Sequence, residues 1–187
     1  MKGSIRSVLV TIAALLVLQA CASTPNATAN YDHGTDFGVY KTFGYFEKLG
    51  TDAAGYQSLV TQTLKSSARR EMESRGYVYS ETNPDLLINF NARLADKTDV
   101  DQVPIAAPMY MGYRRGLYGG WAGYQTTVDQ YTEGTLNIDI VDAKKSQLVW
   151  EGTAVGRVTR KSQENREAAI DAAVAEIFSK YPFRAGA

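Results

Sequence analysis

The sequence has a single cysteine, a single histidine and no excess of charge of either sign. Cys21 and His33 are the only residues of their types among 187, and 20 Lys and Arg residues balance 20 Asp and Glu residues. This composition excludes a disulfide framework and a metal centre built on several histidines or thiolates. The neutral balance gives no general electrostatic attraction for nucleic acid. We therefore expect no cofactor, no bound metal and no nucleic-acid partner.

Long apolar runs are also scarce, and the main one lies at the N-terminus. Lys2 and Arg6 precede an apolar stretch from Val8 to Leu18, which is the layout of a signal peptide and is too short to span a bilayer as a helix. Beyond Cys21 the longest apolar stretch, residues 105–111, is interrupted by Pro108. The sequence therefore predicts a cleaved leader over residues 1–20 and no second membrane segment.

The end of this leader resembles the bacterial lipobox. Leu18 stands three residues before Cys21, and the small residue Ala20 stands one before it. The resemblance implies cleavage between Ala20 and Cys21 and acylation of the Cys21 thiol, and two or three acyl chains, at about 0.8 kcal/mol per buried CH₂, make such an anchor durable. Ala22, in place of Asp, is similar to the proteobacterial pattern for sorting to the outer membrane. The expected location is the bacterial cell envelope, at the outer membrane facing the periplasm; the alternative is an unmodified Cys21.

Beyond Cys21 the length suits one domain. Residues 22–30 are small and polar without apolar periodicity, so residues 21–30 are predicted to be an acylated cysteine with a flexible tether of at most ~30 Å. A single α+β domain is expected over residues 31–182, followed by a short tail over residues 183–187.

Hydrophobic periodicity predicts the order β-α-β-β-β-β-α. Strands are expected at residues 42–47, 77–80, 86–95, 135–142 and 148–154, the last two flanking a turn at 143–147. Amphipathic helices are expected at residues 56–72, with Gly76 as the stop, and at residues 163–180, with Ser162 as the N-cap. This order favours one mostly antiparallel sheet with both helices on one face.

Alternation within the last two strands predicts their register. Even-numbered residues should face the core, which places Ile140 opposite Trp150 and assigns Leu148 to the core face. Cross-strand partners must share a face, so the hairpin loop needs an odd length unless a bulge intervenes. Gly152 should leave a shallow groove that lets the last helix approach closely.

Several segments together resemble the bacterial lipoprotein family called domain of unknown function 4136. They are Asp32 to Thr42, Asn83 to Phe90, Tyr131 to Leu136, Ile138 to Ala143 and Leu148 to Gly152. The resemblance covers most of residues 31–182 and implies an envelope lipoprotein. It supplies neither an activity nor catalytic residues, and within the predicted fold these motifs are strands and a turn.

A connection from residue 96 to residue 127 is longer than loops in compact domains usually are. It is rich in glycine, aromatic residues and arginine, and such side chains are frequent in contacts with proteins, sugars and lipid headgroups. The candidate binding residues are Tyr110, Tyr113, Arg114, Arg115, Tyr118, Trp121 and Tyr124. The alternative is a glycine-rich insertion without a partner.

The function expected from these features is a non-catalytic, lipid-anchored module that binds an envelope protein, glycan or lipid through this loop or through the polar face of the sheet. A carboxylate-dependent envelope hydrolase is the alternative, because Glu133, Asp139 and Glu151 share the outward-facing parity. A solvent-facing row of acids explains the same pattern. A purely structural envelope protein is a third possibility, and His33 is expected to be a solvated residue near the tether.

Overall fold

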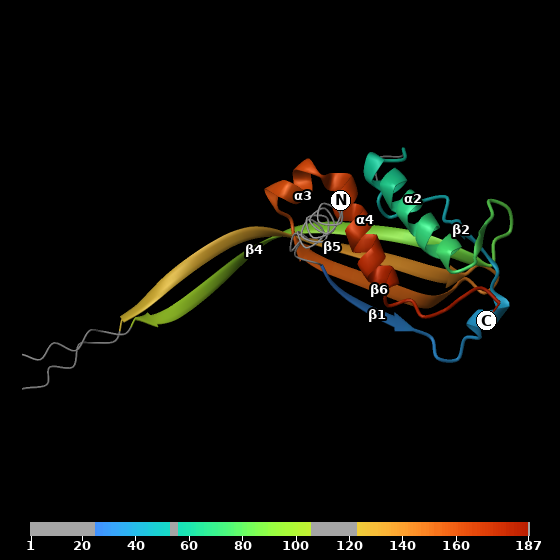
Figure 1. Ribbon diagram of the computed structural model, residues 1–187, viewed down its shortest axis with the longest axis horizontal. Helices are drawn as coiled ribbons and strands as arrows, with labels where there is room; N and C mark the ends of the chain where they lie inside the picture. The colour runs from blue at the N-terminus through green and yellow to red at the C-terminus, as the bar shows by residue number, and fades with distance from the viewer. Residues whose placement is uncertain (1–24, 53–55, 106–122, 187) are drawn as a thin grey trace, which may run out of the picture.

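The computed structural model describes residues 25–52, 56–105 and 123–186. Its elements are β1 (Asn26–Tyr31), the 3-10 turn η1 (Phe37–Val39), β2 (Thr42–Tyr45), α2 (Leu59–Ser74), β3 (Val78–Tyr79), β4 (Leu86–Ile105), β5 (Gly123–Asp142), β6 (Gln147–Arg157), α3 (Arg160–Glu164) and α4 (Arg166–Phe178). The strands form one sheet, and the helices pack against it (Figure 1). This arrangement confirms the predicted α+β class.

The sheet has six strands in the order β1-β6-β5-β4-β2-β3. Pairing is antiparallel from β1 through β6 and β5 to β4, whereas β2 runs parallel to both β4 and β3. The parallel pairing of β2 with β3 follows from α2, which carries the chain back to the start of the next strand. Helices α2 and α4 lie on the same face of the sheet, and no described helix covers the other face (Figure 1).

The core lies between that helix pair and the even-numbered side chains of the sheet. Ile88, Phe90, Ile138, Ile140 and Trp150 are fully buried, as the alternation in the sequence predicts. The helices contribute their own buried side chains, which are Leu64, Ala68, Met72, Val174, Ile177 and Phe178. One face of the sheet is therefore buried beneath the helices, and the described helices leave the other face uncovered.

The β5–β6 hairpin has the predicted register at its centre. Ile140 lies opposite Trp150, and the next pair is Val141 with Leu148, so Val149 is the extra residue of a β-bulge. Because of this extra residue, even-numbered side chains of β6 before Val149 point to the face opposite to that of Trp150. Leu148 consequently lies on the open face, 44% exposed, and the prediction that it faces the core is wrong.

Gly152 occupies the close approach between β6 and α4. A Cβ placed there would collide with the ring of Trp150 and with the side chain of Ile177. This confirms that glycine at this position creates the groove that receives the last helix.

The expected long connection over residues 96–127 is wrong at both ends, and its middle, residues 106–122, lies outside the described residues. Strands β4 and β5 continue through it to Ile105 and from Gly123, and they pair with each other throughout. Beyond the last pair of β5 with β6 they form a two-stranded extension, Asp96–Ile105 with Gly123–Thr132, which we call the ribbon (Figure 1). Its residues alternate without a buried face, so hydrophobic periodicity gave no strand signal there. Backbone pairing and cross-strand side-chain contacts order it instead.

The tether is shorter than predicted, because residues 26–30 belong to β1. This strand pairs with β6 from Asn26 opposite Val155 to Tyr31 opposite Trp150. Only Ala27 of this strand is buried, at 8% exposure, so its small polar residues gave no apolar alternation. The domain therefore begins before residue 31, and residues 1–24 lie outside the described part of the chain.

The C-terminal segment also differs from its prediction. Thr159, and not Ser162, is the N-cap. In this capping box the backbone N–H of Ser162 donates to Thr159 Oγ1, and the Ser162 hydroxyl accepts from the backbone N–H of Thr159. The helix breaks at Asn165 into α3 and α4. Gly76 ends α2 with a φ of 89°, as expected. The predicted tail is packed against the domain, because the ring of Phe183 stacks on that of Phe37 with centroids 3.5 Å apart.

Candidate functional site on the open face of the sheet

The open face of the sheet carries rows of hydrogen-bonding side chains. Register places Asn89, Asp139 and Glu151 side by side across β4, β5 and β6, and the next row holds Asn91, Asn137 and Thr153. Thr153 Oγ1 donates to Asn137 Oδ1 at 3.0 Å, which fixes the amide of the second row. The face is thus a flat array of amides, hydroxyls and carboxylates, a composition that suits a polar ligand.

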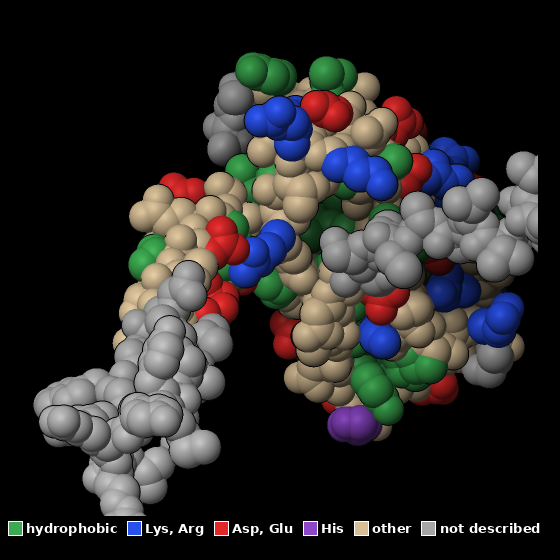
Figure 2. Space-filling model, turned by 60° about the vertical axis from the view of Figure 1, so that its left-hand side comes forward, with side chains coloured by type: hydrophobic (Ala, Val, Ile, Leu, Met, Phe, Trp, Pro, Cys, Tyr) green, Lys and Arg blue, Asp and Glu red, His purple; other side chains and the backbone are tan. Residues whose placement is uncertain are grey.

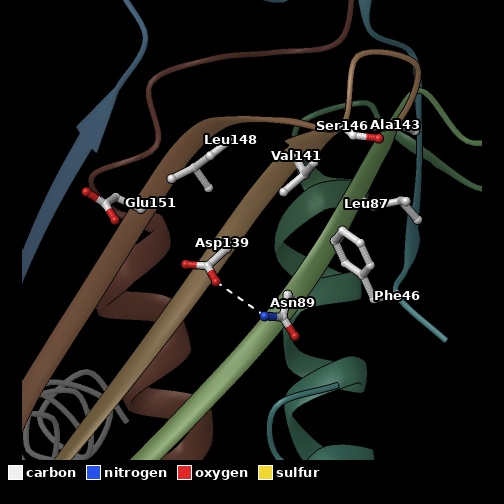
Figure 3. Close-up of a pocket in the computed structure, with 9 residues that line it drawn as sticks. All are labelled: Phe46, Leu87, Asn89, Asp139, Val141, Ala143, Ser146, Leu148 and Glu151. Atoms are coloured by element: carbon white, nitrogen blue, oxygen red, sulfur yellow. Dashed lines mark hydrogen bonds between the residues drawn. The ribbon is translucent and has the colours of Figure 1, made fainter. Parts of the chain in front are cut away.

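A shallow depression of about 560 Å³ lies at one end of this face. Its apolar side is formed by Phe46, Leu87, Val141 and Leu148, and its polar side by Asn89, Asp139 and Glu151, with Ala143 and Ser146 of the hairpin at the rim (Figure 3). Phe46 enters from the segment after β2. The depression is therefore amphipathic, which is typical of small-molecule and glycan sites.

Asp139 is the central polar residue of the depression. Its carboxylate accepts a hydrogen bond from Asn89 Nδ2 at 3.3 Å (Figure 3). It accepts a second from Asn91 Nδ2 at 3.0 Å. Burial raises the pKa of Asp139 above its usual range, the negative charge of Glu151 adds to the rise, and the two amides oppose it. A ligand that donates hydrogen bonds to this carboxylate would stabilise its charged form.

Asn89 is itself held in place by the segment that carries Phe46. Its Oδ1 accepts a hydrogen bond of 3.2 Å from the backbone N–H of Gly50, next to the buried Leu49. With its carbonyl so engaged, the Asn89 amide nitrogen is oriented toward Asp139. The segment after β2 therefore positions both the aromatic and the amide of the depression.

Two of the three acids grouped by the sequence come together. Asp139 and Glu151 are direct cross-strand partners, and no Lys or Arg of the described residues forms an ion pair with either. Glu133 stands six residues along β5, roughly 20 Å away at about 3.3 Å per residue. It forms an ion pair with Lys97 at 3.7 Å instead, so it does not belong to this site.

The aromatic candidate residues cannot be placed at the site. Tyr110, Tyr113, Arg114, Arg115, Tyr118 and Trp121 lie outside the described residues, as do Ala20 and Cys21. The backbone of Tyr124 belongs to β5, opposite Pro104. His33 is exposed and packs its ring against Tyr31, with centroids 4.3 Å apart.

Sequence reasoning missed the apolar half of the depression. Leu148 reaches the open face only because of the bulge at Val149, and Phe46 lies beyond the last residue of β2. Leu87 and Val141 gave the available signals, since both are apolar residues at odd-numbered positions, which the alternation assigns to the outward face. Within the described residues, no group of three or more His, Cys, Asp or Glu side chains is arranged to hold a metal ion. Among the described helices, none is long and apolar enough to cross a membrane.

A two-layer α+β fold with one open, polar sheet face is the class that this geometry defines. The family model for the domain of unknown function DUF4136 matches residues 27–183, and the chain belongs to this family. The match extends over β1 and over Phe183, in agreement with the domain limits of the structure.

Solved structures with the same fold are distant in sequence. A DUF4136 family protein from Bacteroides thetaiotaomicron is 17% identical, with a TM-score of 0.54 over 89% of this chain and 100% of that one. A PDZ domain protein from Parabacteroides distasonis is 15% identical, with a TM-score of 0.55 over 94% of this chain. This chain spans only 40% of that protein's length. No curated protein matches the sequence significantly.

Proposed function

We propose that the protein is a lipid-anchored lipoprotein of the bacterial envelope, facing the periplasm at the outer membrane, that binds an envelope glycan without catalysing a reaction. The leader, the lipobox-like residues around Cys21 and membership of the DUF4136 family support the envelope location. In this proposal Cys21 carries the acyl chains and its membrane partner is the lipid leaflet.

The depression on the open face supports the binding role most directly. Phe46 offers an apolar ring for the face of a sugar, while Asn89, Asp139 and Glu151 offer donors and acceptors for its hydroxyl groups. The site is shallow and continuous with the polar rows beside it, so it suits one segment of an extended saccharide better than a small enclosed substrate. This chemistry favours a glycan over an apolar lipid chain.

In this proposal, the start of β1 at Asn26 would keep the domain close to the membrane. Only residues 22–25 separate Cys21 from β1, and five residue steps at about 3.4 Å each reach no more than roughly 17 Å. A lipid on Cys21 would therefore hold the domain at the membrane surface, within reach of surface-linked saccharides.

Binding can be tested on the full-length lipoprotein in detergent by titration calorimetry, with wall saccharides released by a muramidase as the probe. Phe46→Ala and Asp139→Asn should each weaken binding at least tenfold. Gln62→Ala, on the exposed side of α2, is the matched control and should leave it unchanged. Absence of binding by the unmodified protein, or equal loss in all three variants, would reject the proposed site.

The pair of carboxylates also favours a second candidate, an envelope hydrolase. Asp139 and Glu151 are cross-strand partners, and the raised pKa of Asp139 is the property expected of a general acid. In that case the full-length protein would shorten wall saccharides over time, and Glu151→Gln would abolish the turnover. Intact saccharides after prolonged incubation would leave the binding role as the function.

A further inference from the structure

Within the described residues, the outer edge of β4 has no strand beside it for most of its length. β2 pairs with β4 only from Leu86 to Ile88, where Phe46 N donates to Ile88 O at 3.2 Å. Backbone groups in an antiparallel strand alternate in direction, so the residues that share the parity of Ile88 point their N–H and C=O groups away from β5. Along the exposed edge these residues are Ala92, Leu94, Asp96, Thr98, Val100 and Gln102.

The same alternation holds on the other side of the ribbon. Thr132 of β5 accepts a hydrogen bond from Val158 N at 2.8 Å, which shows that even-numbered residues of β5 point away from β4. β6 ends at Arg157, and the described residues place no strand beside β5 beyond it. A pair of strands that packs against no other layer is only marginally stable in water. Packing within the domain therefore does not explain the length of the ribbon.

The ribbon is acidic, as Figure 2 shows from the Asp and Glu side chains along it. Asp99 and Asp129 lie opposite each other, and Arg157 pairs with both, at 3.5 and 2.7 Å. Lys97 pairs with Glu133. No described Lys or Arg pairs with Asp96 or Asp101, which lie on the edge strand itself.

We propose that the edge of β4 from Ala92 to Gln102 binds an extended, lysine- or arginine-bearing segment of a partner protein as an added strand. Outward-pointing backbone groups supply the hydrogen bonds, and the carboxylates of Asp96 and Asp101, which form no ion pair with a described Lys or Arg, select a basic segment. A second copy of this chain is the competing occupant, and the test below distinguishes it. This interaction uses a different surface from the depression and goes beyond glycan binding.

The alternation of the backbone provides a test that separates this edge from the rest of the ribbon. Thr98→Pro removes one outward N–H and leaves the β4–β5 hydrogen bonds in place. Val128→Pro is the matched control, since it removes an outward N–H from the opposite edge. Pro104 already stands at an even-numbered position of the same edge, which shows that the ribbon accommodates proline there.

The probe is a blocked, fluorescent ten-residue peptide of alternating lysine and valine, titrated against the full-length protein in detergent. Binding should weaken at least tenfold in Thr98→Pro and change less than twofold in Val128→Pro. The double variant Asp96→Asn with Asp101→Asn should weaken binding several-fold and reduce its salt dependence, with the fold intact by circular dichroism.

Three outcomes would overturn the proposal. The peptide fails to bind the unmodified protein, both proline variants bind it equally, or sedimentation shows self-association that Thr98→Pro removes. The last result would identify the occupant as a second copy. None of these outcomes bears on saccharide binding by the Phe46 depression, so the two proposals can fail separately.

Discussion

The hydroxyl of Tyr40 donates a hydrogen bond of 2.8 Å to the carboxylate of Asp142, joining the segment before β2 to the end of β5. Both side chains are buried, and Asp142 also accepts bonds of 2.9 Å from the backbone N–H groups of Lys144 and Lys145. This contact connects two of the segments that resemble DUF4136, and it assigns both a structural role.

Replacing Tyr40 with Phe should lower the free energy of unfolding by about 1.5–3 kcal/mol, the usual worth of a hydrogen bond to a charged group. Urea denaturation of the two proteins would measure the difference. Tyr79→Phe is the control, because its hydroxyl makes only a 3.5 Å contact with the exposed Glu81. Equal stability of Tyr40→Phe and the parent protein would contradict the role given to this bond.

Stability should fall as the pH is lowered through about 4. Burial opposes ionisation of Asp142, but the N–H donors of Lys145 and Lys144 and the Tyr40 hydroxyl outweigh it and hold its pKa below the usual range. Asp85 has a lowered pKa for the same reason, since donors from Lys41 and Thr42 outweigh its burial. As the pH falls, these carboxylates are protonated in the unfolded chain before they are protonated in the folded protein. The stabilisation is therefore present above the unfolded pKa of about 3.9 and is lost below it.

This dependence can be measured from unfolding curves between pH 7 and pH 3. Asp142→Asn should be less stable at pH 7 and should show a flatter decline toward pH 3. A decline as steep as that of the unmodified protein would show that the proton uptake belongs to other carboxylates.

Asp139→Asn should have the opposite effect on stability. The pKa of Asp139 is raised in the folded state, so the cost of ionising it there builds up as the pH rises above the unfolded pKa of about 3.9. The variant should therefore melt at a higher temperature than the unmodified protein at pH 7, and the difference should vanish near pH 3. A gain in stability combined with loss of ligand binding would be the trade-off expected of a functional residue.

Gly152→Ala should destabilise the domain by about 1–3 kcal/mol, the usual cost of overpacking a core. The added Cβ would displace Trp150 or Ile177, neither of which has room to move in the core. Gly156→Ala is the control, because its Cβ would meet only Pro25 at 3.6 Å or more, an ordinary contact distance. Thermal melting of both variants would separate the close approach at Gly152 from a general effect of losing glycine.

The sequence predicted those parts of the fold in which one face is buried. Period-two alternation located the paired strands and the partnership of Ile140 with Trp150, and the small size of Gly152 indicated where α4 approaches. It did not reveal β1 or the ribbon, because neither has an apolar face and both are ordered by backbone pairing. The sequence also did not reveal the bulge at Val149, because the alternation of apolar and polar residues in a short strand does not show where an extra residue is inserted.

The candidate site was predictable only in its polar half. Asp139 and Glu151 are odd-numbered, so the alternation of the strands predicted them on the open face, and the structure brings them side by side. The position of Phe46 depends on how the segment after β2 folds back, through the buried Leu49 and the bond from Gly50 N to Asn89. Such a tertiary arrangement leaves no local sequence pattern.

The pairing of β1 with β6 has a consequence for the order in which the protein forms. Tyr31 pairs with Trp150 in the sheet, and the ring of Phe37 stacks on that of Phe183. More than one hundred residues separate the members of each pair. Contacts between such distant points slow folding, because a long stretch of chain must be arranged before they can form. A growing chain therefore keeps its first strand unpaired until β6 has been made, and a protein truncated before β6 would expose that strand to proteases and chaperones.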